Sequence, residues 1–188
     1  MNWKTMLLCL IFASTVSYGF EWDPDYDTAI SSGTQADIIR IFKFAVEFNE
    51  SNKKMERPGA YHEVSELLEL YHGLILMPAY RQCVQILSRE DDENLAKEML
   101  KLLVSYENSA DEELSTRFGH LYRSNPGLIE KCMRSFDRRG QKELIIHLES
   151  AWGLDKDLHQ DEVYKQKVQK LKIRLKIETA APIGTTIK

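Results

Sequence analysis

Apolar residues recur at helical spacing along most of this chain, and one stretch of the pattern occurs twice. The stretch from Leu70 to Leu103 returns in degenerate form between Leu121 and Trp152. From the cysteines onward, matching positions lie 49 residues apart: Cys83, Leu87, Leu95, Met99 and Leu103 correspond to Cys132, Phe136, Leu144, Leu148 and Trp152. Because the apolar spacing is retained while few residues are identical, the pattern predicts a helical hairpin present in two copies.

Local signals predict where the helices begin and end. Thr34 and Asp37 have the spacing of a capping box, and Pro58 stands at the favoured first position of a second helix. Pro78 is expected to restart or kink the helix of the first copy. Asn125-Pro126 should end the helix that precedes the second copy's cysteine, because a residue before proline is pushed out of helical geometry. Gly140 is expected to mark the turn into the helix from Leu144 to Trp152.

These elements predict an all-α fold of about eight helices without a clear strand. Helical hairpins stacked in chain order are similar in architecture to HEAT-like or armadillo-like solenoids, or to a right-handed superhelix. With 43% apolar and 29% charged residues, the composition is that of an ordinary globular protein. We expect an acidic loop at residues 20–33, one helical domain at 34–178 and a mobile tail at 179–188.

The first nineteen residues have the pattern of a signal peptide. Lys4 supplies the positive start, Met6 to Val16 are mostly apolar, and Ser17 and Gly19 place small residues before an expected cut after Gly19. The apolar run is shorter than the roughly 20 residues that cross a bilayer as a helix. The sequence therefore predicts an exported protein, secreted or periplasmic.

Export affects the interpretation of the cysteines. Cys83 and Cys132 remain after removal of the signal, and they occupy equivalent positions of the two copies. Paired thiols are common in an oxidising compartment, so one interpretation is a disulfide between them. The other is a pair of buried free thiols that act as small apolar residues. Neither cysteine has a Cys-x-x-Cys partner or another nucleophile signature.

Charge is divided unevenly along the chain, whose net charge is −4. Residues 20–115 hold 9 Lys/Arg and 20 Asp/Glu, whereas residues 116–188 hold 15 Lys/Arg and 9 Asp/Glu. If the helices stack in chain order, this uneven distribution places negative charge at one end of the molecule and positive charge at the other. Such a distribution can steer a charged partner. The candidate partner-binding residues are the acids of the two connectors: Glu90, Asp91, Asp92, Glu93, Glu107, Asp111, Glu112 and Glu113.

Residues 165–176 form a basic stretch with six basic side chains and no acid. An apolar stripe at Val163, Val168, Leu171 and Leu175 predicts a helix, although residues 171–177 also alternate as a short strand would. The favoured interpretation is a final amphipathic helix that covers the core. The alternative is peripheral contact with an anionic membrane or an acidic partner.

Catalytic and metal-binding signatures are weak. His62, Glu66 and Glu69 share a helix face, but the second histidine of a zinc-protease motif is missing. We predict no cofactor and no metal, and no nucleic-acid partner, because binding motifs for them are lacking. The leading hypothesis is an exported protein-binding module, either an immunity protein that neutralises a toxin or an envelope adaptor. The rival is a cell-wall- or lipid-directed enzyme with an acid/base pair drawn from Glu63, Glu66, His72 or Glu149.

Overall fold

The computed structural model describes residues 34–52, 71–106 and 112–177. These residues form eight α-helices and one π-helix without strands, which confirms the predicted all-α class. The elements are α3 (Gln35–Asn52), the π-helix η2 (His72–Leu76), α5 (Met77–Leu87), α6 (Glu93–Ser105), α7 (Glu112–Ser124), α8 (Pro126–Met133), α9 (Arg138–Leu154), α10 (Lys156–Gln160) and α11 (Glu162–Leu175). The signal peptide, the acidic loop, the helix predicted from Pro58 and the tail at 179–188 lie outside these residues.

Side-chain caps explain why most of the helices start where they do. An Asp or Asn oxygen accepts a hydrogen bond from a free backbone N–H of the first turn; the caps of α6, α8, α9, α10 and α11 are Asp92, Asn125, Asp137, Asp155 and Asp161. At α3 half of the predicted capping box is present, because the Asp37 N–H donates to Thr34 Oγ1. The Asp37 carboxylate accepts from the Thr34 hydroxyl, whereas in a full capping box it would accept from the Thr34 backbone N–H.

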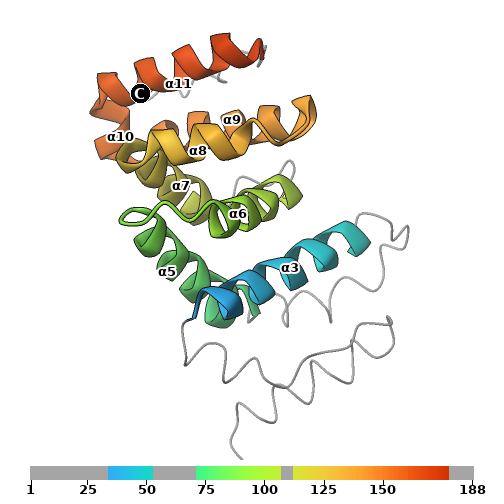
Figure 1. The fold of residues 1–188 in the computed structure, drawn as a ribbon. Helices are drawn as coiled ribbons and strands as arrows, with labels where there is room; N and C mark the ends of the chain where they lie inside the picture. Colours follow the sequence, from blue (N-terminus) through green and yellow to red (C-terminus); the bar gives the residue numbers. More distant parts are fainter. Residues whose placement is uncertain (1–33, 53–70, 107–111, 178–188) are drawn as a thin grey trace, which may run out of the picture.

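The helices stack in chain order. Figure 1 shows the chain rising through the molecule from α3 at one end to α11 at the other. α3 packs on α6, α6 packs on α8 and α9, and α9 packs on α7, α10 and α11. This arrangement is compatible with stacked hairpins; the solenoid itself stays a prediction.

The two predicted copies correspond to α5–α6 and α8–α9. Equivalent positions have the same environment, since Cys83, Cys132, Leu95, Leu144, Met99 and Leu148 are all fully buried. Two other matched pairs differ in burial. Leu103 is fully buried, whereas Trp152 is only partly buried against the core. The pair Leu87 and Phe136 differs in the same way, so the duplicated pattern holds at three of the five matched pairs.

The structure tests three local features of the sequence. At Pro78 the chain restarts as an α-helix, because the π-helix η2 ends at Leu76 and α5 begins at Met77, whose N–H donates to the His72 carbonyl in the π pattern. Pro78 has no N–H of its own to offer, and a π turn just before it accommodates that loss. The prediction of a turn at Gly140 is wrong, because Asp137 caps α9 and the helix begins at Arg138, two residues before the glycine. Residues 171–175 are helical, and Lys176 ends α11 with a left-handed φ of 52°.

Buried tyrosines tie the layers together. Tyr80 of α5 donates its hydroxyl to the Leu114 carbonyl of α7 at 3.0 Å, and Tyr164 of α11 donates to Leu148 O of α9 at 2.9 Å. Both rings are almost completely buried. Each hydroxyl reaches a helical carbonyl on a neighbouring element, so both buried hydroxyls are hydrogen-bonded within the protein.

Candidate functional site

The predicted acidic surface is largely used to hold the fold together. Asp91 accepts a hydrogen bond of 2.8 Å from Asn125 Nδ2, which also donates to the Leu87 carbonyl at 3.1 Å. Asp92 is occupied as the cap of α6 through the Leu95 N–H. The turn between α5 and α6 is thus bonded to the turn between α7 and α8.

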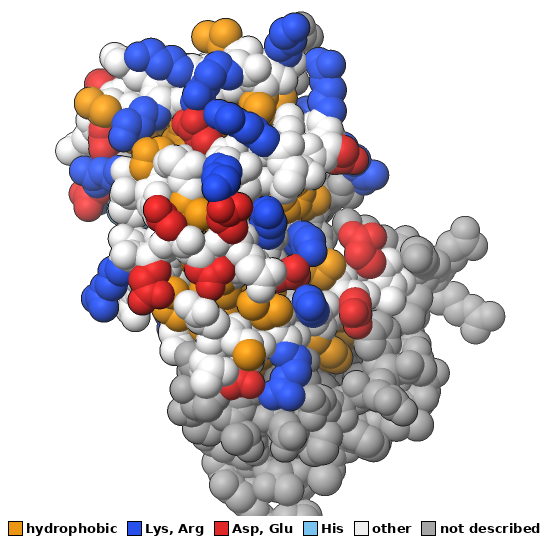
Figure 2. All heavy atoms as spheres, viewed as in Figure 1, with side chains coloured by type: hydrophobic (Ala, Val, Ile, Leu, Met, Phe, Trp, Pro, Cys, Tyr) orange, Lys and Arg blue, Asp and Glu red, His pale blue; other side chains and the backbone are white. Residues whose placement is uncertain are grey.

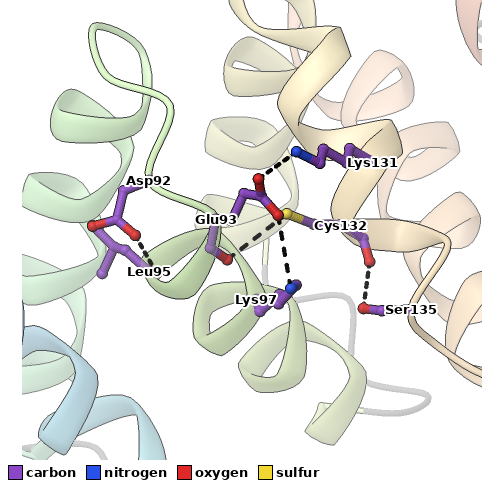
Figure 3. A network of polar contacts seen from close by, with 7 residues as sticks. All are labelled: Asp92, Glu93, Leu95, Lys97, Lys131, Cys132 and Ser135. Atoms are coloured by element: carbon purple, nitrogen blue, oxygen red, sulfur yellow. Dashed lines mark hydrogen bonds and ion pairs between the residues drawn. The ribbon is translucent and has the colours of Figure 1, made fainter.

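Glu93 joins α6 to α8. Figure 3 shows its carboxylate between Lys131 of α8, to which it is hydrogen-bonded, and Lys97 of α6, whose Nζ lies 3.8 Å away. The Lys131 hydrogen bond lowers the pKa of Glu93 against a smaller opposing effect of burial. This acid is paired within the chain, and it is a poor candidate for recognising a partner.

The predicted disulfide is not formed in the structure. Cys83 and Cys132 are free, buried thiols. They lie on α5 and α8, two helices that both pack on α6, and Cys132 Sγ is directed at the Glu93 carbonyl at 3.8 Å (Figure 3). Burial raises the pKa of both thiols, which keeps them protonated and unreactive. The two cysteines therefore match the alternative interpretation, in which buried free thiols act as small apolar residues.

Glu113 links α5 to α7. Its carboxylate accepts two hydrogen bonds from Arg81, of 2.6 and 2.9 Å, and one of 2.7 Å from Arg117. The Arg81 hydrogen bond outweighs partial burial and, with Arg117, lowers the pKa of Glu113 from 4.5 to about 2. The ion pair is fixed in a bidentate geometry, the arrangement in which an Arg–carboxylate contact is strongest.

Of the remaining predicted partner-binding residues, Glu90 and Glu112 are exposed. Glu107 and Asp111 lie outside the described residues. Of the eight predicted acids, Asp91, Glu93 and Glu113 are bonded to neighbouring elements and Asp92 caps its own helix, so the prediction of one acidic binding surface stays a prediction.

An open hollow of about 420 Å³ lies along α7. We call it the α7 hollow; its lining residues are Glu112, Glu113, Thr116, Arg117, His120 and Leu154. It combines the exposed carboxylate of Glu112 with Leu154, which is 43% exposed at the end of α9. Apolar surface bordered by a few convergent polar groups is the usual composition of a binding site.

His120 is oriented at the α7 hollow by a second residue. Its Nε2–H donates to Asp155 Oδ2 at 3.1 Å, while Oδ1 of the same carboxylate caps α10. Burial acts to raise the pKa of Asp155, but hydrogen bonds from Leu158 and His120 outweigh it and leave that pKa lowered. Asp155 stays charged and holds the imidazole in place.

Sequence reasoning missed most of this site. It pointed to Glu112 and Glu113 but not to Arg117, His120 or Leu154. The α7 members fall at helical spacing, yet Leu154 and Asp155 come from the far end of another helix. No fixed spacing links these two groups, so only the packing of α7 on α9 brings them together.

A Ser–His contact is buried in the core. Ser115 Oγ lies 2.8 Å from His147 Nδ1, and His147 Nε2 lies 3.1 Å from the Leu103 carbonyl. Since a carbonyl only accepts, Nε2 carries the proton and Nδ1 accepts from the serine hydroxyl. Ser115 is fully buried and His147 is 4% exposed, so the contact cross-links α6, α7 and α9 and has no route to substrate.

The acid/base pair of the enzyme hypothesis is not assembled in the described residues. Glu149 is paired with Lys172 of α11 at 2.7 Å, whereas His72 lies on η2 beside the ring of Tyr106. Glu63 and Glu66 lie outside the described residues, as does the possible metal set of His62, Glu66 and Glu69. Within residues 34–52, 71–106 and 112–177, no group of three His, Cys, Asp or Glu is placed to hold a metal.

Comparisons with protein-family models, curated proteins and solved structures find no match to this chain. The class that the fold and the site define is an all-α protein of packed helices with an open hollow of mixed polar and apolar lining between α7 and the end of α9. No helix in the described part of the chain is long and apolar enough to span a membrane.

Replacing Glu113 by glutamine is expected to weaken the fold at neutral pH and much less in acid. Because its folded pKa is about 2 and its ordinary value is 4.5, the stabilisation is complete above about pH 4.5 and is lost as pH falls toward 2. The side chain is 36% exposed, so we expect only about 1 kcal/mol after solvent screening. Urea denaturation of both proteins across this pH range measures the difference.

Glu112→Gln is the matched control, because Glu112 is the exposed neighbouring acid. It should leave stability nearly unchanged at every pH. A loss of equal size in the two variants, or a Glu113 effect that persists undiminished near pH 2, would contradict the role assigned to the Arg81 ion pair.

Proposed function

We propose that the protein is an exported protein-binding module that recognises its partner through the α7 hollow. The observation that supports this most is the exposure of Glu112 and Leu154 in a hollow whose charged neighbours Glu113 and Arg117 are paired with each other. A carboxylate beside an exposed leucine suits a partner that presents a basic group next to an apolar one.

A rigid framework favours recognition over chemistry. Two lining residues of the hollow have partners within the chain: Glu113 is bonded to Arg81 and Arg117, and His120 is bonded to Asp155. Preorganised groups lose little entropy on binding, which raises affinity for a given contact area. These features fit an immunity protein that covers a toxin's surface, and they fit an envelope adaptor in the same way.

Export forms part of the proposal and rests on the sequence of residues 1–19, with its basic start, apolar run and small residues before the expected cut. In such a compartment the natural partners are other exported proteins or toxins that enter the envelope. The partner should therefore be sought among proteins of that compartment.

The test is affinity capture of the partner by the tagged protein, followed by a titration of the purified pair. Glu112→Lys and Leu154→Ser should each weaken binding by about tenfold or more, as expected for residues at the centre of an interface. Both side chains are exposed, so the variants should fold normally.

Matched controls exist elsewhere on the surface. Glu47→Lys on α3 makes the same charge change, and Leu74→Ser removes a leucine that is 48% exposed on η2. Both should bind as the parent does. If the controls weaken binding as much, or if His120→Gln abolishes a turnover that Glu112→Lys leaves intact, the α7 hollow is not a protein-recognition site.

A further inference from the structure

α11 has one face in the core and another that is unusually apolar for a surface. Tyr164, Val168 and Leu171 are buried, and the helix packs on α9. On the solvent side Val163 is 63% exposed and Ile173 is 74% exposed. The expectation of a final amphipathic helix explains the first face. It does not explain two aliphatic side chains directed at water.

Lysines accompany these aliphatic residues. Lys167 and Lys170 follow Val163 at i+4 and i+7, so they share its side of the helix. Other basic residues of α11 are used within the fold: Lys172 pairs with Glu149 at 2.7 Å, and Arg174 pairs with Glu130 at 2.6 Å. We use "the outer face of α11" for Val163, Lys167, Lys170 and Ile173.

The position of α11 makes this face accessible to a flat surface. Figure 1 shows α11 as the last layer at one end of the stack. Figure 2 shows that Lys and Arg side chains gather at the same end, while Asp and Glu are more frequent toward the middle of the described part. The α7 hollow belongs to a different helix, so the outer face of α11 is a separate feature.

We propose that the outer face of α11 docks the protein on an anionic lipid surface. Exposed aliphatic side chains enter the boundary between headgroups and acyl chains, while lysines attract the anionic headgroups. The outer face of α11 offers both positive charge for anionic headgroups and aliphatic side chains for the acyl chains. An acidic protein would use only the lysines. This proposal does not depend on the function of the α7 hollow.

The experiment is co-sedimentation of the full chain with vesicles of phosphatidylcholine and phosphatidylserine in about a 2:1 ratio, and with vesicles of phosphatidylcholine alone. The protein should bind the anionic vesicles at least about tenfold more strongly, and salt near 1 M, where the screening length is about 3 Å, should remove most of this preference. Lys167→Gln/Lys170→Gln should lower binding by roughly 25-fold, at about fivefold for each lysine. Val163→Ser/Ile173→Ser should lower it by roughly tenfold.

Lys43→Gln/Arg89→Gln is the matched control, because it removes two exposed charges from α3 and from the α5–α6 turn. It should bind as the parent does. All variants keep residues 1–33 unchanged, so any difference between them reports on the substituted surface. Circular dichroism should show equal helix content.

Three outcomes would overturn the proposal. The first is equal binding to neutral and anionic vesicles. The second is a loss of vesicle binding in the control variant as large as that in the lysine variant, which would indicate that binding depends on net charge alone. The third is retention by immobilised polyglutamate, lost in the lysine variant, without binding to anionic vesicles, which would assign this face to an acidic protein.

Discussion

Gly119→Ala is expected to destabilise the protein by about 2 kcal/mol, although alanine is the better helix former. Gly119 lies in α7 where that helix approaches α9 and α10. A Cβ at this position would lie 2.6 Å from the Ala151 Cβ and 2.7 Å from the Leu158 Cδ1. Ala151 Cβ cannot move without its backbone, so α7 must separate from α9. The gain in helix propensity, about 1 kcal/mol, is smaller than this overpacking cost.

The matched control is Gly153→Ala near the end of α9, where an added Cβ meets nothing within 4 Å. It should be neutral or stabilise the protein by up to about 1 kcal/mol. Chemical denaturation of the parent and both variants gives the comparison. If Gly119→Ala proves as harmless as Gly153→Ala, the close packing of α7 on α9 described above is wrong.

His147→Ala is expected to destabilise the protein by about 3 kcal/mol. The imidazole is 4% exposed and bridges Ser115 Oγ and the Leu103 carbonyl, thereby joining α7 and α6 to its own helix, α9. Its removal leaves a cavity and deprives the buried Ser115 hydroxyl of its acceptor, whereas the Leu103 carbonyl keeps the hydrogen bond from the Tyr106 N–H. The lost Ser115 hydrogen bond costs free energy, because water does not replace it in a closed core.

A double-mutant cycle with Ser115→Ala separates these contributions. Ser115→Ala alone should cost about 1 kcal/mol, and in the His147→Ala background it should cost much less, because the hydroxyl has already lost its acceptor. Thermal or urea unfolding of the four proteins measures the coupling. Strictly additive effects would show that the Ser115–His147 hydrogen bond contributes nothing to stability.

Much of the helical framework could be predicted from the sequence. Met99 and Leu148, at matching positions of the two copies, are both fully buried, as the apolar register predicts. Such patterns are local: helical spacing selects the buried face, and a polar residue just before a helix can cap it. The same local reasoning failed at Gly140, where the cap at Asp137 starts α9 earlier than the glycine suggests.

The candidate site could be predicted only in part. Glu112 and Glu113 were selected as acids in an acidic stretch, but their environments differ. Arg81, 32 residues earlier in the chain, binds Glu113 and leaves Glu112 as the exposed acid. Nothing in the local sequence distinguishes the two. The cysteines also could be predicted only in part. Their matching positions in the two copies predict that both are buried, but not whether the two thiols bond to each other.

The sequence by itself therefore determined the all-α class, several buried positions that the two copies share and the starts of α3 and α8, since these depend on residues within a few positions of each other. Only the tertiary structure decided which acids are paired, which thiols stay free, and that His120, bonded to Asp155, lines one hollow with Leu154. Those outcomes depend on contacts between residues more than thirty positions apart. Such contacts are set by how the helices pack, and chain spacing does not encode that packing.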